Sequence, residues 1–304
     1  MVDTAPLVAT MGRALLYLFL ASGLTVSGVY ASIGTSWPVW CVGQLMLAVA
    51  CTQWFCIMHE CGHKTFSGGR SFDTVVGHLA GVFCLMPFET WRFVHHGHHL
   101  WTGWRDRDPT TRGILPRPIG RTERMFFNTC WRLWIPVFAF AYRATIFWNL
   151  RKLIRYYPRQ KRAFTINVVA LFIIYTIAAP WMIKIFSLPL LLHFAVMDPI
   201  MLSQHSHIPQ KLAGSAAVKP IVKAEQGVYT RSVLLPRLLS TWVFLGFDLH
   251  GLHHVYPYTP GYRLHRLDQV AGITMSWRRW IKEAKRVPAD ILIFKNWDQT
   301  RIRI

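Results

Sequence analysis

The sequence predicts an all-α integral membrane protein, with about four transmembrane helices and a cytoplasmic helical cap. Three observations lead to this prediction: long uncharged apolar segments, basic residues concentrated in two stretches, and histidines clustered at helical spacing. The chain has 304 residues, 52% of them apolar, and a positive mean hydropathy. Because soluble domains approach the same composition, the continuous apolar segments are what indicate a membrane protein.

Four segments are long and apolar enough to cross a bilayer, which requires about 20 residues in a helix. Residues 14–32 and 38–58 contain no charged side chain and are separated by a short turn. Residues 163–183 and 185–203 form a second pair around Lys184. The first apolar segment is not followed by a signal-peptide cleavage pattern, so we expect it to be retained.

Two shorter apolar stretches are predicted to lie at the membrane surface. Residues 74–90 are near the lower length limit for a span, and a span there would place the first two histidine clusters on opposite sides of the bilayer. Residues 131–148 contain Arg143, which suits an interfacial amphipathic helix. Between these stretches, residues 105–125 are rich in Pro, Gly and Asp and are predicted to form a surface loop.

The positive charges indicate the orientation in the membrane. The net charge is +20, and only Arg13 and Lys184 of the 34 Lys and Arg residues lie outside residues 59–162 and 204–304. Loops rich in Lys and Arg stay on the cytoplasmic side. We therefore expect one membrane domain over residues 1–304, with both large polar parts and both termini in the cytoplasm. No nucleic-acid-binding motif accompanies the charge, so we expect no nucleic-acid partner.

Most of the 14 histidines fall in four short segments. In HHGHH, the side chains of His95, His98 and His99 share one helix face at i, i+3 and i+4, whereas His96 points further round. Several neutral imidazoles on one face are suited to binding a metal. The other segments are HECGH, with His59 and His63; QHSH, with His205 and His207; and HGLHH, with His250, His253 and His254.

The number of histidines predicts two metal ions. With His96 set aside, eight candidate ligands come from HECGH, HHGHH and HGLHH, and one or two more come from residues 204–207, which exceeds the four ligands of a tetrahedral zinc site. Imidazole ligands accept Fe, Zn, Cu or Ni, so the spacing does not name the ion. His78, alone in an apolar stretch, is interpreted as a packing residue. Asp198 is either a functional group within a span or part of a helix-ending turn before Pro199.

The chain resembles the membrane-bound fatty acid desaturase superfamily over about residues 50–265. The resemblance is carried by HECGH at 59–63, by HHGHH at 95–99 with the following WTGWRDRDP, and by DLHGLHHVYPYTPGY at 248–262. The QHSHIP segment at 204–209 is similar to the corresponding stretch of plant oleate-type desaturases.

This resemblance implies a non-haem di-iron centre, with two Fe ions and O2 as co-substrate. A ninth ligand is implied from the QHSH pair, with His205 favoured over His207 because it follows Gln204. Asp248 is the preferred acceptor for an imidazole N–H, and Gln204 is a further supporting residue. Asp106 and Asp108 are interpreted equally well as turn residues before Pro109. The eight other implied ligands are His59, His63, His95, His98, His99, His250, His253 and His254.

The resemblance further implies an oxidoreductase that introduces a double bond into a fatty acyl chain carried by a lipid, CoA or acyl carrier protein. A lipid or carotenoid hydroxylase or ketolase, or an acyl acetylenase, would use the same centre. A membrane metal transporter or metal-binding protein is a more distant alternative, because it would need ionisable residues inside the first two spans. The chain has no cytochrome b5 haem motif, so we expect a separate electron donor of ferredoxin or cytochrome b5 type. Acidic donors or acyl carriers would suit the basic surface, alongside membrane lipids.

Overall fold

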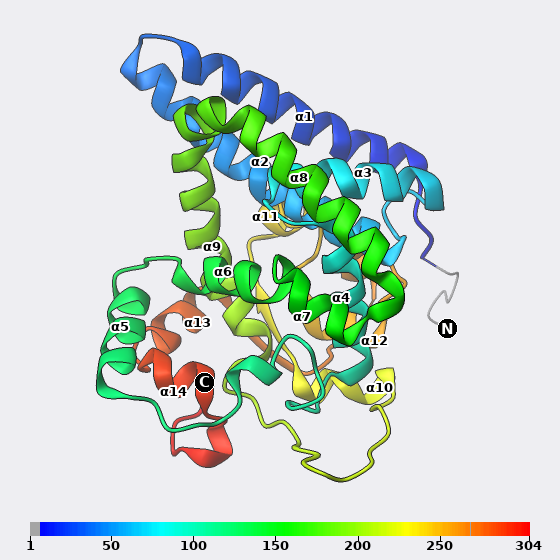
Figure 1. Ribbon diagram of the computed structural model, residues 1–304, viewed down its shortest axis with the longest axis vertical. Helices are drawn as coiled ribbons and strands as arrows, with labels where there is room; N and C mark the ends of the chain where they lie inside the picture. Colours follow the sequence, from blue (N-terminus) through cyan, green and yellow to red (C-terminus); the bar gives the residue numbers. More distant parts are fainter. Residues whose placement is uncertain (1–6, 268) are drawn as a thin grey trace.

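The computed structural model describes residues 7–267 and 269–304, and helices make up most of the described chain (Figure 1). The first two helices, α1 (Met11–Ile33) and α2 (Trp37–His63), form a hairpin closed by a three-residue turn. The hairpin is tight because two glycines face each other: a Cβ atom added at Gly43 would lie 2.8 Å from the carbonyl oxygen of Gly28. The predicted segments 14–32 and 38–58 lie within these helices, and α2 continues far enough to carry HECGH.

A second long apolar helical segment runs from Pro158 to His205. It contains α8 (Lys161–Trp181), the π-helical η4 (Met182–Phe186) and α9 (Ser187–His205). Figure 1 shows α9 turning away from α8 at η4. With α1 and α2, this makes three helical segments among the described residues that are long and apolar enough to cross a membrane.

The predicted surface stretch 74–90 is divided between two helices, α3 (Arg70–Phe83) and α4 (Phe88–Trp101). They are bent by 104°, and the pair would raise the number of candidate spans to four if it counted as one. The bend is packed closely, because a Cβ atom added at Gly77 would lie 2.3 Å from the ring of Phe88. This bend directs α4, which carries HHGHH, into the protein.

The predicted helix over residues 131–148 is shorter in the structure, where one continuous helical segment runs over Val137–Phe147 and consists of α6 (Val137–Tyr142) and the π-helical η2 (Arg143–Phe147). Residues 131 and 132 belong to the end of a separate helix, α5 (Arg121–Arg132). The position of the segment at the membrane surface stays a prediction. The break comes at Trp134, whose φ of 60° is left-handed, and at Pro136, which precedes α6. Asp198 supports this arrangement from within α9: its Oδ1 accepts a hydrogen bond from the Ala139 amide at 2.5 Å.

The C-terminal part contains the only β-sheet among the described residues. Strands β1 (Arg231–Leu234) and β2 (Ile273–Ser276) pair in parallel, with Arg231 opposite Ile273. Strands of four residues are at the lower length limit for a period-two pattern in the sequence. The remaining elements are η1 (Arg112–Ile114), α7 (Leu150–Tyr156), η3 (Pro158–Gln160), α10 (Lys223–Gln226), η5 (Gly227–Tyr229), α11 (Arg237–Trp242), α12 (His250–Val255), η6 (Gly261–Arg266), α13 (Trp277–Ala284), α14 (Ala289–Phe294) and η7 (Trp297–Gln299).

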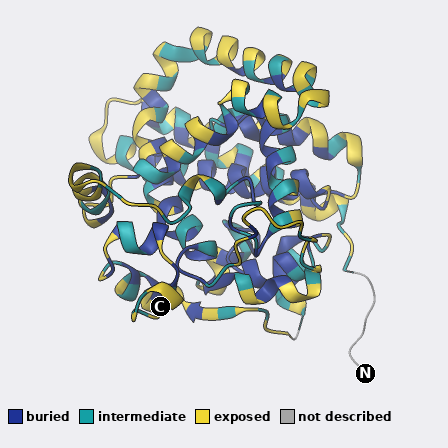
Figure 2. Cartoon of the chain, turned by 60° about the horizontal axis from the view of Figure 1, so that its bottom comes forward, coloured by how far each residue is buried: buried dark blue, intermediate teal, exposed yellow. Residues whose placement is uncertain are grey.

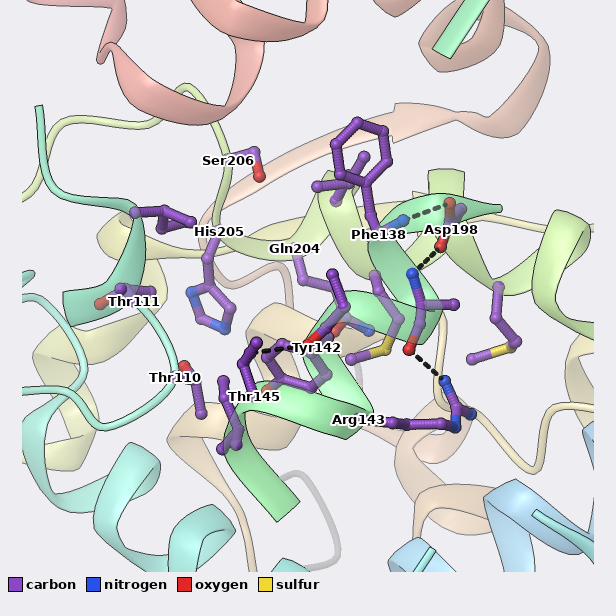
Figure 3. Close-up of a pocket in the computed structure, with 18 of the residues that line it drawn as sticks. Thr110, Thr111, Phe138, Tyr142, Arg143, Thr145, Asp198, Gln204, His205 and Ser206 are labelled. Atoms are coloured by element: carbon purple, nitrogen blue, oxygen red, sulfur yellow. Dashed lines mark hydrogen bonds between the residues drawn. The ribbon is translucent and has the colours of Figure 1, made fainter. Parts of the chain in front are cut away.

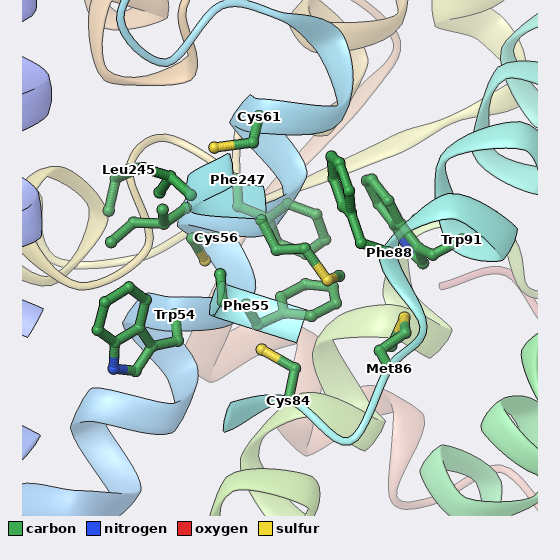
Figure 4. Packing of buried hydrophobic residues seen from close by; sticks show 14 of the residues in the cluster. Trp54, Phe55, Cys56, Cys61, Cys84, Met86, Phe88, Trp91, Leu245 and Phe247 are labelled. Carbon is green, nitrogen blue, oxygen red and sulfur yellow. The ribbon is translucent and has the colours of Figure 1, made fainter. Parts of the chain in front are cut away.

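The main core lies where α2, α3 and α4 meet the segment before α12, and Figure 4 shows Phe55, Trp91 and Phe247 among its side chains. Outer helices instead expose large apolar residues, including Phe19 on α1 at 74% and Ile177 on α8 at 76% (Figure 2). A surface of this kind suits contact with lipid, while the buried core holds the histidine-bearing helices in place.

Candidate metal centre

The histidines predicted from the sequence converge in two groups. The first group, His59, His63, His95 and His253, has ligand atoms that all lie within 4.8 Å of one another. These residues come from the C-terminal end of α2, from α4 and from α12. His99 joins them, because its Nε2 lies 3.2 Å from Nε2 of His95 and 3.0 Å from Nε2 of His253.

The second group consists of His98, His205, His250 and His254, and its ligand atoms also lie within 4.8 Å of one another. Nε2 of His250 lies 2.8 Å from Nε2 of His205 and 3.0 Å from Nε2 of His254. The i, i+3, i+4 spacing of HHGHH sends His98 to this group and His95 and His99 to the other. One helix therefore supplies both groups.

The outer nitrogens of the second group show which tautomers these rings adopt. Nδ1 of His98 lies 2.6 Å from Oδ2 of Asp108, and Nδ1 of His205 lies 3.2 Å from the carbonyl oxygen of Tyr229. Nδ1 of His254 lies 3.2 Å from Oε1 of the buried Gln226 side chain. Carbonyl, amide and carboxylate oxygens only accept, so each Nδ1 carries the hydrogen and each Nε2 presents a lone pair.

Burial reinforces this arrangement. Burial, and to a smaller extent the neighbouring imidazoles, hold the pKa of His250, His253 and His254 well below its usual value, so these rings are neutral. Neutral Nε2 atoms about 3 Å apart with their lone pairs facing each other repel unless a cation binds between them. The buried Nε2 of His59 also has no hydrogen-bond partner among the described residues. Nine converging imidazoles thus form a donor set that fits two transition-metal ions.

His207 was included among the predicted ligands, and the structure does not place it with them. Its Nδ1 lies 2.9 Å from the carbonyl oxygen of Lys295, and its Nε2 lies 2.9 Å from that of Ile302. Its φ of 56° turns the backbone after His205, so that neighbouring histidines point to different regions. His205 is therefore the histidine of this pair that faces the centre.

The expectation that Asp248 orients a ligand is wrong. Its Oδ1 accepts from the hydroxyl of Ser240 at 2.5 Å and its Oδ2 accepts from the amide of Leu235 at 3.1 Å, which fixes the turn before α12. Asp108 was interpreted equally as a turn residue and as an acceptor for a ligand N–H. It accepts a hydrogen bond from the His98 ring and another from the Thr110 amide at 2.8 Å, so it has both roles.

Four groups near the histidines differ in how far the sequence indicates them. Glu60, within HECGH, lies 3.3 Å from Nδ1 of His59. Gln226 and the Tyr229 carbonyl lie in a segment without a metal-binding motif, so spacing gave no signal for them. Gln204 is buried, and its Nε2 has no partner among the described residues.

His96 is exposed, as its position on the helix predicted. Its Nδ1 lies 2.7 Å from the carbonyl oxygen of Arg92.

An apolar cavity of about 510 Å³ adjoins the centre. Its wall follows α9 from His205 and Gln204 through Met201 to Asp198, a rise of roughly 10 Å at 1.5 Å per residue. Figure 3 shows His205 and Gln204 near one part of the cavity and Asp198 at another. The dimensions and lining suit a long apolar chain better than a compact polar molecule. The histidines that line it are His59, His95, His98, His205 and His250.

A profile of the fatty acid desaturase family matches residues 35–275. The chain belongs to the fatty acid desaturase family. The matched region includes all nine converging histidines, so the family assignment and the geometry of the centre concern the same part of the molecule.

Three relatives illustrate the family match. A probable fatty acid desaturase of Sorghum bicolor is 28% identical over 78% of this chain and 64% of its own length. The sn-1 acyl-lipid omega-3 desaturase (ferredoxin) of Synechocystis sp. is 28% identical over 42% of this chain and 35% of its own length. The acyl-lipid omega-3 desaturase (cytochrome b5) of the Arabidopsis thaliana endoplasmic reticulum is 22% identical over 88% of this chain and 71% of its own length. The chain spans less than two thirds of the length of the sorghum protein.

Proposed function

We propose that this chain is an O2-dependent desaturase that introduces a double bond into a fatty acyl chain. The observation that carries the proposal is the position of two groups of inward-facing Nε2 atoms beside a long apolar cavity. The reaction consumes O2, two electrons and two protons, removes two hydrogens from adjacent carbons and releases two water molecules. Iron ions bound at the two groups would supply the reduction of O2 and the cleavage of an unactivated C–H bond.

The residues of the chain would position the substrate and hold the ligands. The apolar walls of α9, α6 and α14, including Met201, Phe138 and Phe294, exclude water around the acyl chain. Asp108 and Gln226 fix the orientation of His98 and His254 by accepting their Nδ1 hydrogens. Nine ligands divide as five in the first group and four in the second, and we assign one iron to each.

The membrane arrangement belongs to the same proposal. We assign spans to residues 14–32, 38–58, 163–183 and 185–203, with both termini and the histidines in the cytoplasm. The helical hairpin of α1 and α2 supports the first pair of spans, and the turn of α9 away from α8 at η4 supports the second pair (Figure 1). The distribution of Lys and Arg supports the orientation. In this arrangement, residues 59–162 and 204–304 form the cytoplasmic cap of a single domain.

The proposed reaction needs an electron donor. Two relatives carry ferredoxin and cytochrome b5 in their names, and we extend a separate donor of one of these types to this chain. The acyl chain would be presented on a membrane lipid, on CoA or on an acyl carrier protein. The basic net charge favours acidic protein partners.

A fatty-acid and lipid profile by mass spectrometry tests the activity. Cells expressing the wild type, with a compatible reductase, should contain a product lighter by two hydrogens that is absent with His98→Ala. The matched control is His96→Ala, which alters an exposed histidine of the same segment that belongs to neither group, so the iron content should stay at the wild-type level and product should still be detected, in a smaller amount. A product that gains oxygen would instead assign a hydroxylase or ketolase, and a further loss of two hydrogens an acetylenase.

Metal analysis of the purified chain separates the enzyme from a transporter. Two irons per chain that survive dialysis agree with the proposal. Zinc or nickel that exchanges freely, with no lipid product, would contradict it. Because His98 belongs to the second group, His98→Ala should also lower the iron content, which is a measurement independent of turnover.

A further inference from the structure

The centre has a second side that does not face the cavity. Four of the nine converging histidines, His63, His99, His253 and His254, are not among the residues that line the cavity. The exposed ring of His96 lies near this side, with its centroid 6.0 Å from that of His63. His96 is therefore a surface group within short electron-tunnelling distance of a metal-ligating ring.

The charged groups around His96 are mainly cationic. Lys64, Arg92 and Lys223 lie close enough to act electrostatically on the His96 ring. Arg92 is partly neutralised, because its Nη2 lies 2.7 Å from Oε2 of Glu89. Within residues 7–267 and 269–304, no carboxylate forms an ion pair with Lys64 or Lys223, so both are available to a negatively charged partner.

The position of Lys223 follows from contacts with the centre. Gln226, three residues later in α10, donates to the carbonyl oxygen of His99 at 2.8 Å and so fixes α10 against α4. Nζ of Lys223 lies 4.0 Å from the ring centroid of Tyr258, which is 69% exposed. Leu100, 50% exposed, is one helical turn after His96 on the same face of α4. The surface therefore combines cations with exposed apolar groups.

We propose that this surface, the His96 face (Lys64, Arg92, His96, Leu100, Lys223 and Tyr258), is the docking site of an acidic one-electron carrier protein. Electrons enter the first histidine group by way of His96 and His63. A reduced carrier gives up one electron at each docking and leaves oxidised, so two dockings supply the two electrons for one double bond. The inference rests on the proposed function and adds the location and charge of the donor.

The arrangement allows donor and substrate to bind together. The acyl chain occupies the cavity beside His59, His98 and His205, whereas the carrier approaches from the side of His63. Neither partner blocks the other, so the second electron does not require release of the substrate. A small surface with a few cations and apolar groups suits a transient complex that forms and separates at each electron transfer.

The test uses the iron-loaded full chain in lipid nanodiscs. The probes are a plant-type [2Fe–2S] ferredoxin and, in a separate arm, the soluble domain of cytochrome b5. The variant is Lys64→Asn with Lys223→Glu; Asn is chosen because residue 64 has a φ of 61°, which Asn tolerates. The matched control, Arg278→Gln with Lys282→Glu, changes the net charge equally on exposed positions of α13.

We expect the double variant to raise the Kd of at least one reduced donor about tenfold and to weaken the salt dependence of binding. The α13 control should stay within about twofold of the wild type, because distant charges are screened. Equal effects in both double variants, or none in either, would overturn the assignment of the His96 face. The arm in which the affinity changes identifies the class of carrier.

His96→Leu separates electron entry from docking. The Kd and iron content should remain close to the wild-type values, while oxidation of saturating donor, followed by its visible absorbance, becomes slower. An unchanged oxidation rate would overturn the route through His96. Reduction of the protein by dithionite, without a carrier, separates failure of the docking proposal from failure of the proposed function. If dithionite-reduced protein forms product while the wild type oxidises neither carrier, only the docking proposal fails. If dithionite also gives no product, the proposed desaturase function fails.

Discussion

In the second histidine group, three of four rings donate an Nδ1 hydrogen to a fixed acceptor, whereas in the first group only His59 has such a neighbour among the described residues. Rings of the first group are oriented instead by aromatic packing. The Trp91 ring stacks on His95 at 4.5 Å and 16°, and the Phe247 ring meets His59 edge-on at 5.0 Å. The two groups should therefore respond to different substitutions.

The largest expected effect comes from removing His205, with removal of His207 in the same QHSH segment as the comparison. His205→Ala should lower the iron content from two to about one per chain, because it removes one of the four rings of the second group. His207→Ala should keep both irons and instead lower thermal stability, because His207 contacts carbonyl oxygens of Lys295 and Ile302. Elemental analysis and thermal unfolding measure the two effects. Loss of iron with His207→Ala but not with His205→Ala would reverse the assignment.

Removing the charged acceptor of the second group should have the next largest effect. Asp108→Asn should weaken metal binding in that group by about 10- to 100-fold, because the Nδ1 hydrogen of His98 loses its carboxylate acceptor. The control is Asp106→Asn in the same loop, where the carboxylate accepts from the amides of Ala213 and Gly214. Metal titration with a competing chelator gives both affinities. Equal affinities for the two variants would mean that Asp108 does not orient the ligand.

These two experiments address what the sequence alone left undecided. Helical spacing predicted the convergence of His95, His98 and His99 and the exclusion of His96, because an unbroken helix fixes which side chains share a face. It did not predict how the two groups divide, since one helix serves both. It favoured His205 over His207 only by resemblance, because the deciding feature is a left-handed backbone at residue 207.

The supporting residues show a second limit of sequence reasoning. Asp248 stands two residues before His250, and this proximity made it the preferred partner. In the structure the carboxylate faces Ser240 and Leu235, while Asp108, ten residues after His98, reaches the ligand. Long-range contacts of this kind depend on the turn that carries them. The start of the helix predicted over residues 131–148 was placed too early for a related reason, because composition did not reveal the break at Trp134 and Pro136.

A substitution beneath Trp91 should disturb mainly the first group. Gly62→Ala places a methyl group where a Cβ would lie 2.3 Å from Cζ3 of Trp91, so the indole that stacks on His95 must move. We expect a several-fold loss of affinity in the first group and little change in the second. Gly97→Ala is the control on α4, since its Cβ would meet Tyr157 and Pro109 instead. A loss confined to the second group would contradict the packing account.

The smallest expected effect is on the pH dependence of the metal-free chain. The folded pKa values of His250, His253 and His254 are depressed, chiefly by burial, so below about pH 6.5 the unfolded chain binds more protons than the folded chain. The free energy of unfolding therefore falls as the pH drops below that value, and we expect the melting temperature to decrease by a few degrees between pH 7.5 and 5.5. In His254→Gln, which removes one such group, the decrease should be smaller. Burial also lowers the pKa of the His96 ring, but less, so in His96→Gln the decrease should lie between those of the wild type and His254→Gln. An equal change in both variants would show that burial at the centre is not the cause.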